Sequence, residues 1–134
     1  MELKSNEEKI TRALLVSVDT GEYDAQASLD ELFELVKSAG ADPVLSVTQN
    51  LQKIEKGTFV GTGKLAEIAE ICESQEIDLL VFDSELSPTQ IKNIEAETDV
   101  RVIDRTTLIL DIFAQRARSK AVSYTHLRAH ETLM

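Results

Sequence analysis

Four short apolar runs, each followed along the chain by a segment with helical periodicity, constrain the fold of this sequence more than any other feature. The runs lie at residues 12–18, 43–48, 78–82 and 100–103, and they are rich in Val, Ile and Leu. Runs of this kind are typical of strands buried on both faces, and strands that alternate with helices form parallel sheets. We therefore predict an α/β domain with a four-stranded, mainly parallel sheet and helices on both faces.

Capping signals place the starts of two helices. Ser28 opens a capping-box pattern, which predicts a helix that begins near this residue, with Asp24 as an alternative start one turn earlier. Ser87 is expected to cap a later helix, because Pro88 follows it and Gln90 stands at the position that completes the box.

The length of 134 residues fits a single domain, and the composition excludes several kinds of protein. The single cysteine, Cys72, rules out an internal disulfide and a multi-cysteine zinc site, and its place on an apolar helical stripe predicts a buried thiol. No apolar run approaches the ~20 residues that span a membrane, and no leader sequence is recognisable. We expect a cytoplasmic monomer without a membrane span.

The net charge of −10 argues against a protein that binds nucleic acid through a basic surface alone, because neutralising phosphates requires clustered Lys and Arg. The charge is unevenly distributed. Between Arg101 and Arg118 the chain has four arginines and two aspartates, whereas acids predominate before this segment. A polyanion could therefore meet a local basic patch, although the surface as a whole would not attract it.

Residues 50–63 form a long connection with three glycines and no periodicity, and this connection leads into a predicted helix. Backbone amides at a glycine-rich helix start can hold a phosphate, and Lys64 would add a positive charge. A nucleotide-binding phosphate loop needs glycine at the position of Thr58 and Ser or Thr at the position of Leu65, so a loop of that kind is excluded. A flexible turn and a weak anion site remain as alternatives. We expect residues 57–63 to be exposed and less ordered than the strands.

Aspartates stand at the ends of three predicted strands, at Asp19, Asp83 and Asp104. The carboxyl ends of parallel strands are where sites form, so three acids there could hold Mg²⁺. Alternatively, each aspartate caps the turn or helix that follows it, because its short side chain satisfies free amides.

Three stretches resemble the N-terminal domain of the HflX family of ribosome-associated GTPases. They are residues 61–68 (GTGKLAEI), 82–90 (FDSELSPTQ) and 102–118 (VIDRTTLILDIFAQRAR). The third stretch is the most specific, because all of its consecutive positions are similar to the signature of that family. The resemblance covers residues 10–119, which we take as the domain.

The resemblance implies a parallel α/β domain that is followed, in the complete protein, by a helical coiled-coil segment and a GTPase domain. The family binds the large ribosomal subunit, and its members are linked to splitting stalled or idle ribosomes under stress. Its N-terminal domain contacts ribosomal RNA. GTP and Mg²⁺ belong to the later GTPase domain, so the present chain is expected to need no cofactor and to hydrolyse no GTP by itself.

The residues that would contact RNA or a nucleotide lie in and beside the glycine-rich connection at residues 50–63: Lys53, Lys56, Gly57, Gly61, Gly63 and Lys64. Arg116 and Arg118 form a second basic cluster near the end of a helix predicted over residues 105–119. They could contact phosphate, or they could be favourable charges at a helix C-terminus. We expect no catalytic and no metal-ligating residue.

Residues 1–9 are interpreted as an N-terminal tail. Residues 120–134 resemble translated sequencing-adapter sequence, so the second segment is excluded from the functional interpretation. His126 and His130 lie in the second segment, and no third ligand beside them supports a zinc site. Two alternatives remain open. One is a stand-alone phosphoacceptor or magnesium-dependent enzyme that uses the strand-end aspartates, and the other is a protein-interaction module that uses an apolar face of the last helix.

Overall fold

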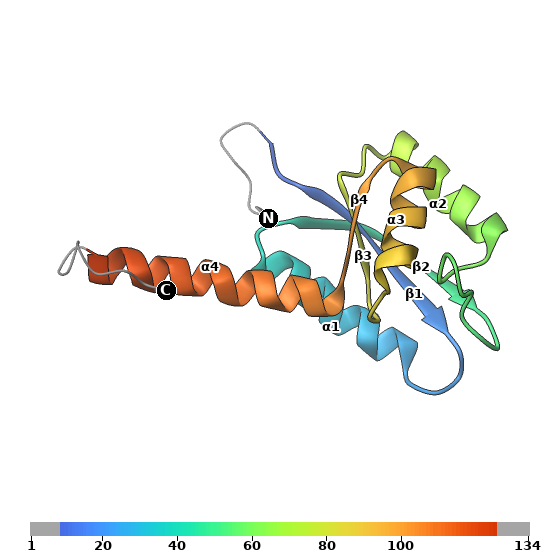
Figure 1. Ribbon diagram of the computed structural model, residues 1–134, viewed down its shortest axis with the longest axis horizontal. Helices are drawn as coiled ribbons and strands as arrows, with labels where there is room; N and C mark the ends of the chain where they lie inside the picture. Colours follow the sequence, from blue (N-terminus) through green and yellow to red (C-terminus); the bar gives the residue numbers. More distant parts are fainter. Residues whose placement is uncertain (1–8, 126–134) are drawn as a thin grey trace.

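The computed structural model describes residues 9–125, with side chains described as far as residue 117. Four strands form one sheet: β1 (Arg12–Asp19), β2 (Asp42–Asn50), β3 (Leu79–Phe82) and β4 (Arg101–Asp104). The strands are ordered β2-β1-β3-β4, and every neighbouring pair is parallel. Helices alternate with them: α1 (Ala25–Ser38), α2 (Thr62–Ser74), α3 (Pro88–Thr98) and α4 (Arg105–Thr125) (Figure 1). The predicted fold class is confirmed.

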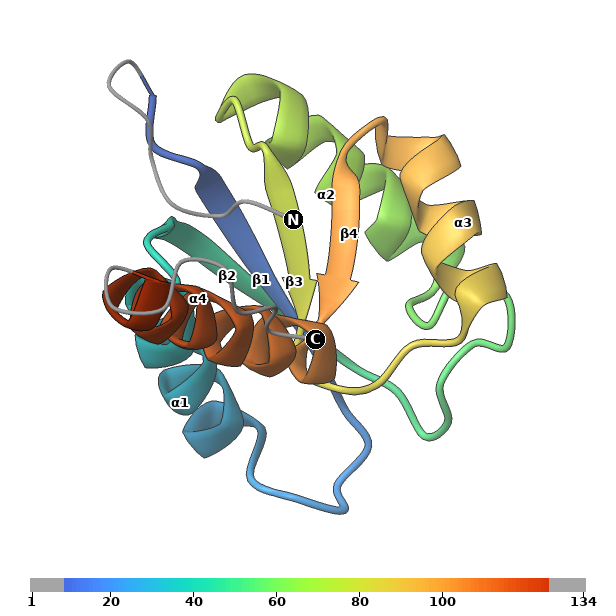
Figure 2. The same cartoon turned by 60° about the vertical axis from the view of Figure 1, so that its left-hand side comes forward.

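The side chains of the strands contribute to two hydrophobic cores, because successive side chains of a strand point to opposite faces of the sheet. Leu14 and Val16 of β1 pack with Phe82 of β3 in the core on the face covered by α2 and α3. Ala13 and Leu15 contribute to the core on the other face, which α1 and α4 cover. Figure 2 shows these two helix pairs on opposite sides of the sheet. Burying both faces explains why the strands read as continuous apolar runs.

Cys72 lies in the core under α2 and α3, where its side chain is buried as predicted. Burial raises the pKa of its thiol to about 11, because a thiolate would lose its hydration there. The thiol is therefore protonated at neutral pH and does not act as a nucleophile.

Helix α1 begins one turn earlier than the capping-box pattern predicts. Asp24 is the N-cap, and its Oδ1 accepts a hydrogen bond from Ala27 N at 3.0 Å. The start near Ser28 is therefore wrong, and the alternative start at Asp24 is confirmed. Because Ser28 lies inside the helix, its hydroxyl is available for a long-range contact, and Glu31 accepts a hydrogen bond from Arg105 of α4 instead of completing a cap.

The capping box of α3 is confirmed. Ser87 Oγ accepts a hydrogen bond from Gln90 N at 3.1 Å, and Gln90 Oε1 accepts one from Ser87 N at 2.9 Å. Pro88 occupies the first helical position, where its missing N–H costs nothing. The start of α3 was therefore predictable from local chemistry alone.

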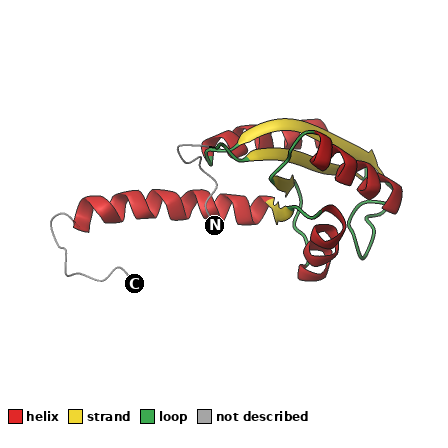
Figure 3. Cartoon of the chain, turned by 90° about the horizontal axis from the view of Figure 1, so that it is seen from above, coloured by secondary structure: helices red, strands yellow, loops and turns green. Residues whose placement is uncertain are grey.

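Helix α4 leaves the sheet after its first turns and continues to Thr125, beyond the predicted end at residue 119 (Figure 3). Leu108 and Ile112 are buried against the sheet, whereas Leu110 and Phe113 are 62% and 60% exposed. Among residues 9–125, no helix combines the length and the apolar character needed to span a bilayer.

Asp78 joins the start of β1 to the start of β3. Its Oδ1 accepts a hydrogen bond from Lys9 Nζ at 2.8 Å, and its Oδ2 accepts one from Arg12 N at 2.9 Å. Partial burial acts to raise the pKa of the Asp78 carboxyl, but these two bonds and the positive charges of Lys9 and Arg12 hold the pKa below its ordinary value. The carboxylate form is therefore favoured in the folded state.

This lowered pKa predicts a stability contribution that depends on pH. The contribution is fully present above the pKa of about 4 of an unfolded Asp, and it is lost as pH falls through the lower folded pKa. We expect Asp78→Asn to lower the melting temperature at pH 7 and to narrow its difference from wild type below pH 4. Melting curves from pH 7 to pH 2 check this, and a constant difference across that range would contradict the assignment.

Candidate functional site

The connection between β2 and α2, residues 51–61, lies at the carboxyl edge of the sheet, beside the tip of β1 (Figure 1). In parallel α/β sheets this edge is where ligand sites form, because the connections that follow the strands gather there. We call this connection the glycine loop. Most of the residues predicted to contact RNA or a nucleotide lie in this loop, so its geometry determines which of them can reach such a ligand.

The second half of the glycine loop is part of the core. Phe59 is 3% exposed and Val60 is fully buried. The rings of Phe59 and Phe82 meet edge to face, with centroids 5.8 Å apart. Phe59 also adopts a positive φ of 68°, which a bulky residue tolerates only where packing holds it. The expectation of an exposed segment at residues 57–63 is therefore wrong for its centre.

Side chains from β2 and α3 hold the backbone of the glycine loop. Gln90 Nε2 donates to the carbonyl oxygens of Glu55 and Lys56, both at 3.2 Å, and Asn93 Nδ2 donates to that of Gly57 at 2.9 Å. Gln49 Oε1 accepts a hydrogen bond from Gly61 N at 2.8 Å. These contacts could not be predicted from the sequence, because they join residues far apart in the chain and no local pattern marks them.

The three lysines of the predicted site differ in their surroundings. Lys53 and Lys56 are exposed. Lys64 lies in the first turn of α2, is partly buried, and forms an ion pair with Glu67 at 3.4 Å. Two of the three ammonium groups are therefore presented to solvent, and the third is already engaged by a carboxylate.

Gly61 and Gly63 stand at the start of α2, and neither has a positive φ. A Cβ atom at Gly61 would lie 3.2 Å from Gln49 Nε2, so this glycine makes room for the Gln49 contact. A Cβ atom at Gly63 would meet nothing within 4 Å. Nothing in the described fold explains glycine at position 63, although glycine weakens a helix relative to alanine.

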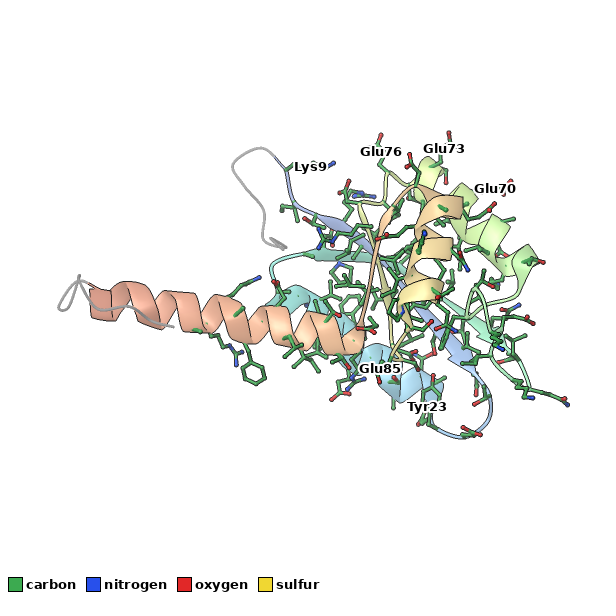
Figure 4. All side chains as sticks on the ribbon, in the orientation of Figure 1. Lys9, Tyr23, Glu70, Glu73, Glu76 and Glu85 are labelled. Atoms are coloured by element: carbon green, nitrogen blue, oxygen red, sulfur yellow. The ribbon has the colours of Figure 1, made fainter. Side chains whose placement is uncertain are left out.

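A hydroxyl network surrounds Asp83 at the same edge of the sheet. Asp83 is buried, and its Oδ2 accepts hydrogen bonds from Ser28 Oγ at 3.0 Å and from Tyr23 Oη at 3.1 Å. Tyr23 lies in the β1–α1 connection (Figure 4), with its Oη also 3.0 Å from the carbonyl oxygen of Val18. Burial and the nearby charge of Asp83 raise the pKa of Tyr23, although a hydrogen bond from Ser17 opposes this. The network joins the β1–α1 connection and the start of α1 to the end of β3.

The other two strand-end aspartates accept hydrogen bonds from backbone amides. Asp19 Oδ1 accepts a hydrogen bond from Gly21 N at 2.9 Å. Asp104 accepts hydrogen bonds from Leu86 N at 2.9 Å and Thr107 N at 3.0 Å. The capping alternative is confirmed for both. Because each strand-end carboxylate has separate partners, the three do not fit a shared Mg²⁺, and no group of metal ligands gathers within residues 9–125.

The second basic cluster is not brought to the glycine loop. Arg116 is exposed on α4, which projects away from the sheet on the side opposite the loop (Figure 1). The side chain of Arg118, and both His126 and His130, lie outside the described residues. The structure therefore gives two separate candidate contacts and not one continuous patch.

Comparison with known proteins finds a matching family model and several relatives. Residues 26–114 match the family described as GTP-binding GTPase N-terminal. GTPase HflX of Lacrimispora saccharolytica is 50% identical over 118 residues, which cover 87% of this chain and 27% of that protein. GTPase HflX of Escherichia coli is 42% identical over 108 residues, which cover 81% of this chain and 25% of that protein. The chain thus spans about a quarter of the length of these relatives.

Solved structures share the fold. The crystal structure of SsGBP with GDP matches with a TM-score of 0.61 at 23% identity, over 79% of this chain and 29% of that chain. A GTP-binding protein from the archaeon Sulfolobus solfataricus, in complex with GDP, matches with a TM-score of 0.59 at 24% identity, over 78% of this chain and 30% of that chain. At these identities the likeness concerns the fold alone.

Proposed function

Because this chain belongs to the family of GTP-binding GTPase N-terminal domains, we propose that it is the ribosome-contacting domain of an HflX-type GTPase. In this proposal the glycine loop binds ribosomal RNA of the large subunit in the cytoplasm. GTP hydrolysis, which requires Mg²⁺ and accompanies ribosome splitting under stress, belongs to a GTPase domain in the part of the relatives that this chain does not span.

The observation that carries the proposal is an exposed pair of lysines on an anchored loop. Lys53 and Lys56 are exposed at the carboxyl edge of the sheet, while Phe59 and Val60 fix the same loop in the core. Phosphate contacts need cations held in a defined place, since each immobilised side chain otherwise costs conformational entropy. A chain of net charge −10 can meet RNA only through such a local arrangement.

The end of α2 far from the glycine loop is acidic, which favours an approach of RNA at the loop. Lys64 lies at the end of α2 that follows the glycine loop. Glu70 and Glu73 of α2, and Glu76 just after it, extend into solvent at the other end (Figure 4). These carboxylates repel phosphate, so an approaching RNA strand is directed toward the glycine loop.

Gly63 supports a close approach of RNA to the start of α2. Its Cα faces open space, and the start of a helix favours negative charge. A glycine there leaves room for a phosphate group to reach the first amides of α2. The open space around Gly63 and the lysines of the glycine loop thus belong to one edge of the molecule.

GTP hydrolysis is expected to be absent from this chain. Lys64 is paired with Glu67, and the segment before it lacks the glycine spacing that cradles the phosphates of a nucleotide. When the chain is incubated with GTP and Mg²⁺, the rate of phosphate release should equal the rate in buffer without the chain. Turnover that copurifies with the chain and disappears in Lys64→Ala would contradict this expectation.

The proposed function is tested by sedimentation of the labelled chain with isolated ribosomal subunits at low salt. We expect it to sediment with large subunits and to remain in the supernatant with small subunits. Equal sedimentation with both, or with neither, would overturn the proposal, because binding by a general attraction to RNA is not expected of an acidic chain.

A further inference from the structure

Helix α3 holds three consecutive carbonyl groups of the glycine loop. Gln90 donates to the carbonyls of Glu55 and Lys56, and Asn93 donates to the carbonyl of Gly57. Gln90 is 7% exposed, so its bonds are shielded from water and are stronger than the same bonds at the surface. The part of the loop that carries Lys56, and that directly follows Lys53 and Ile54, is thereby fastened to a rigid helix.

These bonds leave the lysine side chains available. They involve only main-chain oxygens, and within residues 9–117 no ion pair engages Lys53 or Lys56. Without the bonds, the segment from Lys53 to Gly57 would be held mainly by the backbone pairing of Glu55 with Phe59, because the side chains of Ile54 and Glu55 are exposed. The core anchor Phe59 lies later in the loop and is joined to this segment at Glu55 through two backbone hydrogen bonds, so the bonds from Gln90 and Asn93 add to that pairing.

We propose that Gln90 and Asn93 are positioning residues for RNA binding. They hold the backbone of Glu55, Lys56 and Gly57 in the conformation in which the ammonium groups of Lys56 and the nearby Lys53 meet phosphates, so binding requires less ordering of the loop. This inference rests on the proposed function, because it assigns these two side chains a role in the same contact.

The two roles of Gln90 can be separated by substitution. Its Oε1 accepts the capping bond from Ser87 N, whereas its Nε2 donates to the loop. Gln90→Glu keeps the acceptor of the capping box and loses both donors. Ser87→Ala does the opposite, since it removes the cap and leaves the donors in place. Each variant therefore reports on one function.

Two further variants complete the set. Asn93→Ala removes the bond to Gly57 at an exposed helical position, where alanine favours the helix, so this variant is expected to fold. Thr89→Glu adds the same negative charge as Gln90→Glu at the neighbouring exposed position and leaves the loop bonds intact. It is the matched control for charge.

The experiment measures amide exchange and binding to large ribosomal subunits for the 134-residue chain. Glu55 and Phe59 are the reporters of the loop, because each amide donates to the carbonyl of the other. In Gln90→Glu and Asn93→Ala we expect these two amides to exchange about tenfold faster, and we expect a dissociation constant about tenfold larger. Thr89→Glu should match wild type in exchange and bind at least threefold more tightly than Gln90→Glu. Ser87→Ala should lower the melting temperature and leave binding unchanged.

The inference and the proposed function fail in different ways. If wild type binds large subunits and both Gln90→Glu and Asn93→Ala bind them with the same dissociation constant as wild type, the positioning role is overturned. This holds even if the amides of Glu55 and Phe59 exchange faster in the variants. Unchanged exchange in both variants would also overturn it, since the bonds would not hold the loop. If wild type itself does not bind large subunits, the proposed function is overturned, and the positioning role in RNA binding falls with it.

Discussion

Replacing Phe59 by alanine is expected to lower the free energy of unfolding by about 3 kcal/mol, at the lower end of the range for deleting a buried phenyl ring. The ring is 3% exposed, and it packs edge to face on Phe82 in the core beneath α2 and α3. Alanine would remain at the positive φ of 68°, so the substitution relieves no strain. The loss should appear as a lower midpoint in urea unfolding.

Phe33→Ala is the matched control. Phe33 lies on α1, is 40% exposed, and contacts Lys37 through its ring face, with Nζ 5.4 Å from the ring centre. The same atoms are deleted, but little buried surface is lost, so the expected decrease is below about 1 kcal/mol. Equal effects of the two substitutions would show that the glycine loop is not part of the core.

The fold was predictable because its signal is local and repeated. Buried strands such as Leu79–Phe82 read as continuous apolar runs, and Ser87 with Gln90 forms a complete capping box within one turn. The start of α1 was mispredicted because Asp24 and Ser28 both carry capping side chains. Only the folded chain shows that Asp24 caps the helix and that the Ser28 hydroxyl donates a hydrogen bond to Asp83.

The candidate site was only partly predictable. Its lysines and glycines are visible in the sequence, but the sequence does not show that the loop has an ordered conformation. Phe59 and Val60 form no periodic pattern, and their burial depends on Phe82, which belongs to another strand. The bonds from Gln90 and Asn93 cross from α3 to the glycine loop, so neither residue carries a signal in its own neighbourhood.

Replacing the lysines of the predicted site is expected to have the largest effect on binding. The logarithm of the binding constant falls linearly with the logarithm of the salt concentration, and each phosphate contact that is lost reduces the steepness of this slope by about one unit. Lys53 and Lys56 are exposed, whereas Lys64 is shared with Glu67. We therefore expect the triple variant Lys53→Ala, Lys56→Ala, Lys64→Ala to lower the slope by roughly two to three units.

A control variant carries the same change in net charge at other places. Lys37→Ala, Lys92→Ala and Arg101→Ala remove three exposed cations that lie on α1, α3 and β4. If only the overall charge mattered, this variant and the lysine triple variant would weaken binding equally. We expect the control to change affinity by less than about threefold and to leave the slope within one unit of wild type.

The proposed role of the glycine loop is to contact ribosomal RNA through its lysines. It is tested most directly by measuring the dissociation constant for large ribosomal subunits across a salt series, for wild type, the lysine triple variant and the charge control. We expect a lower slope and weaker binding for the lysine triple variant alone. Identical affinities and slopes for wild type and that variant would contradict it, and the RNA contact would then lie elsewhere in the protein.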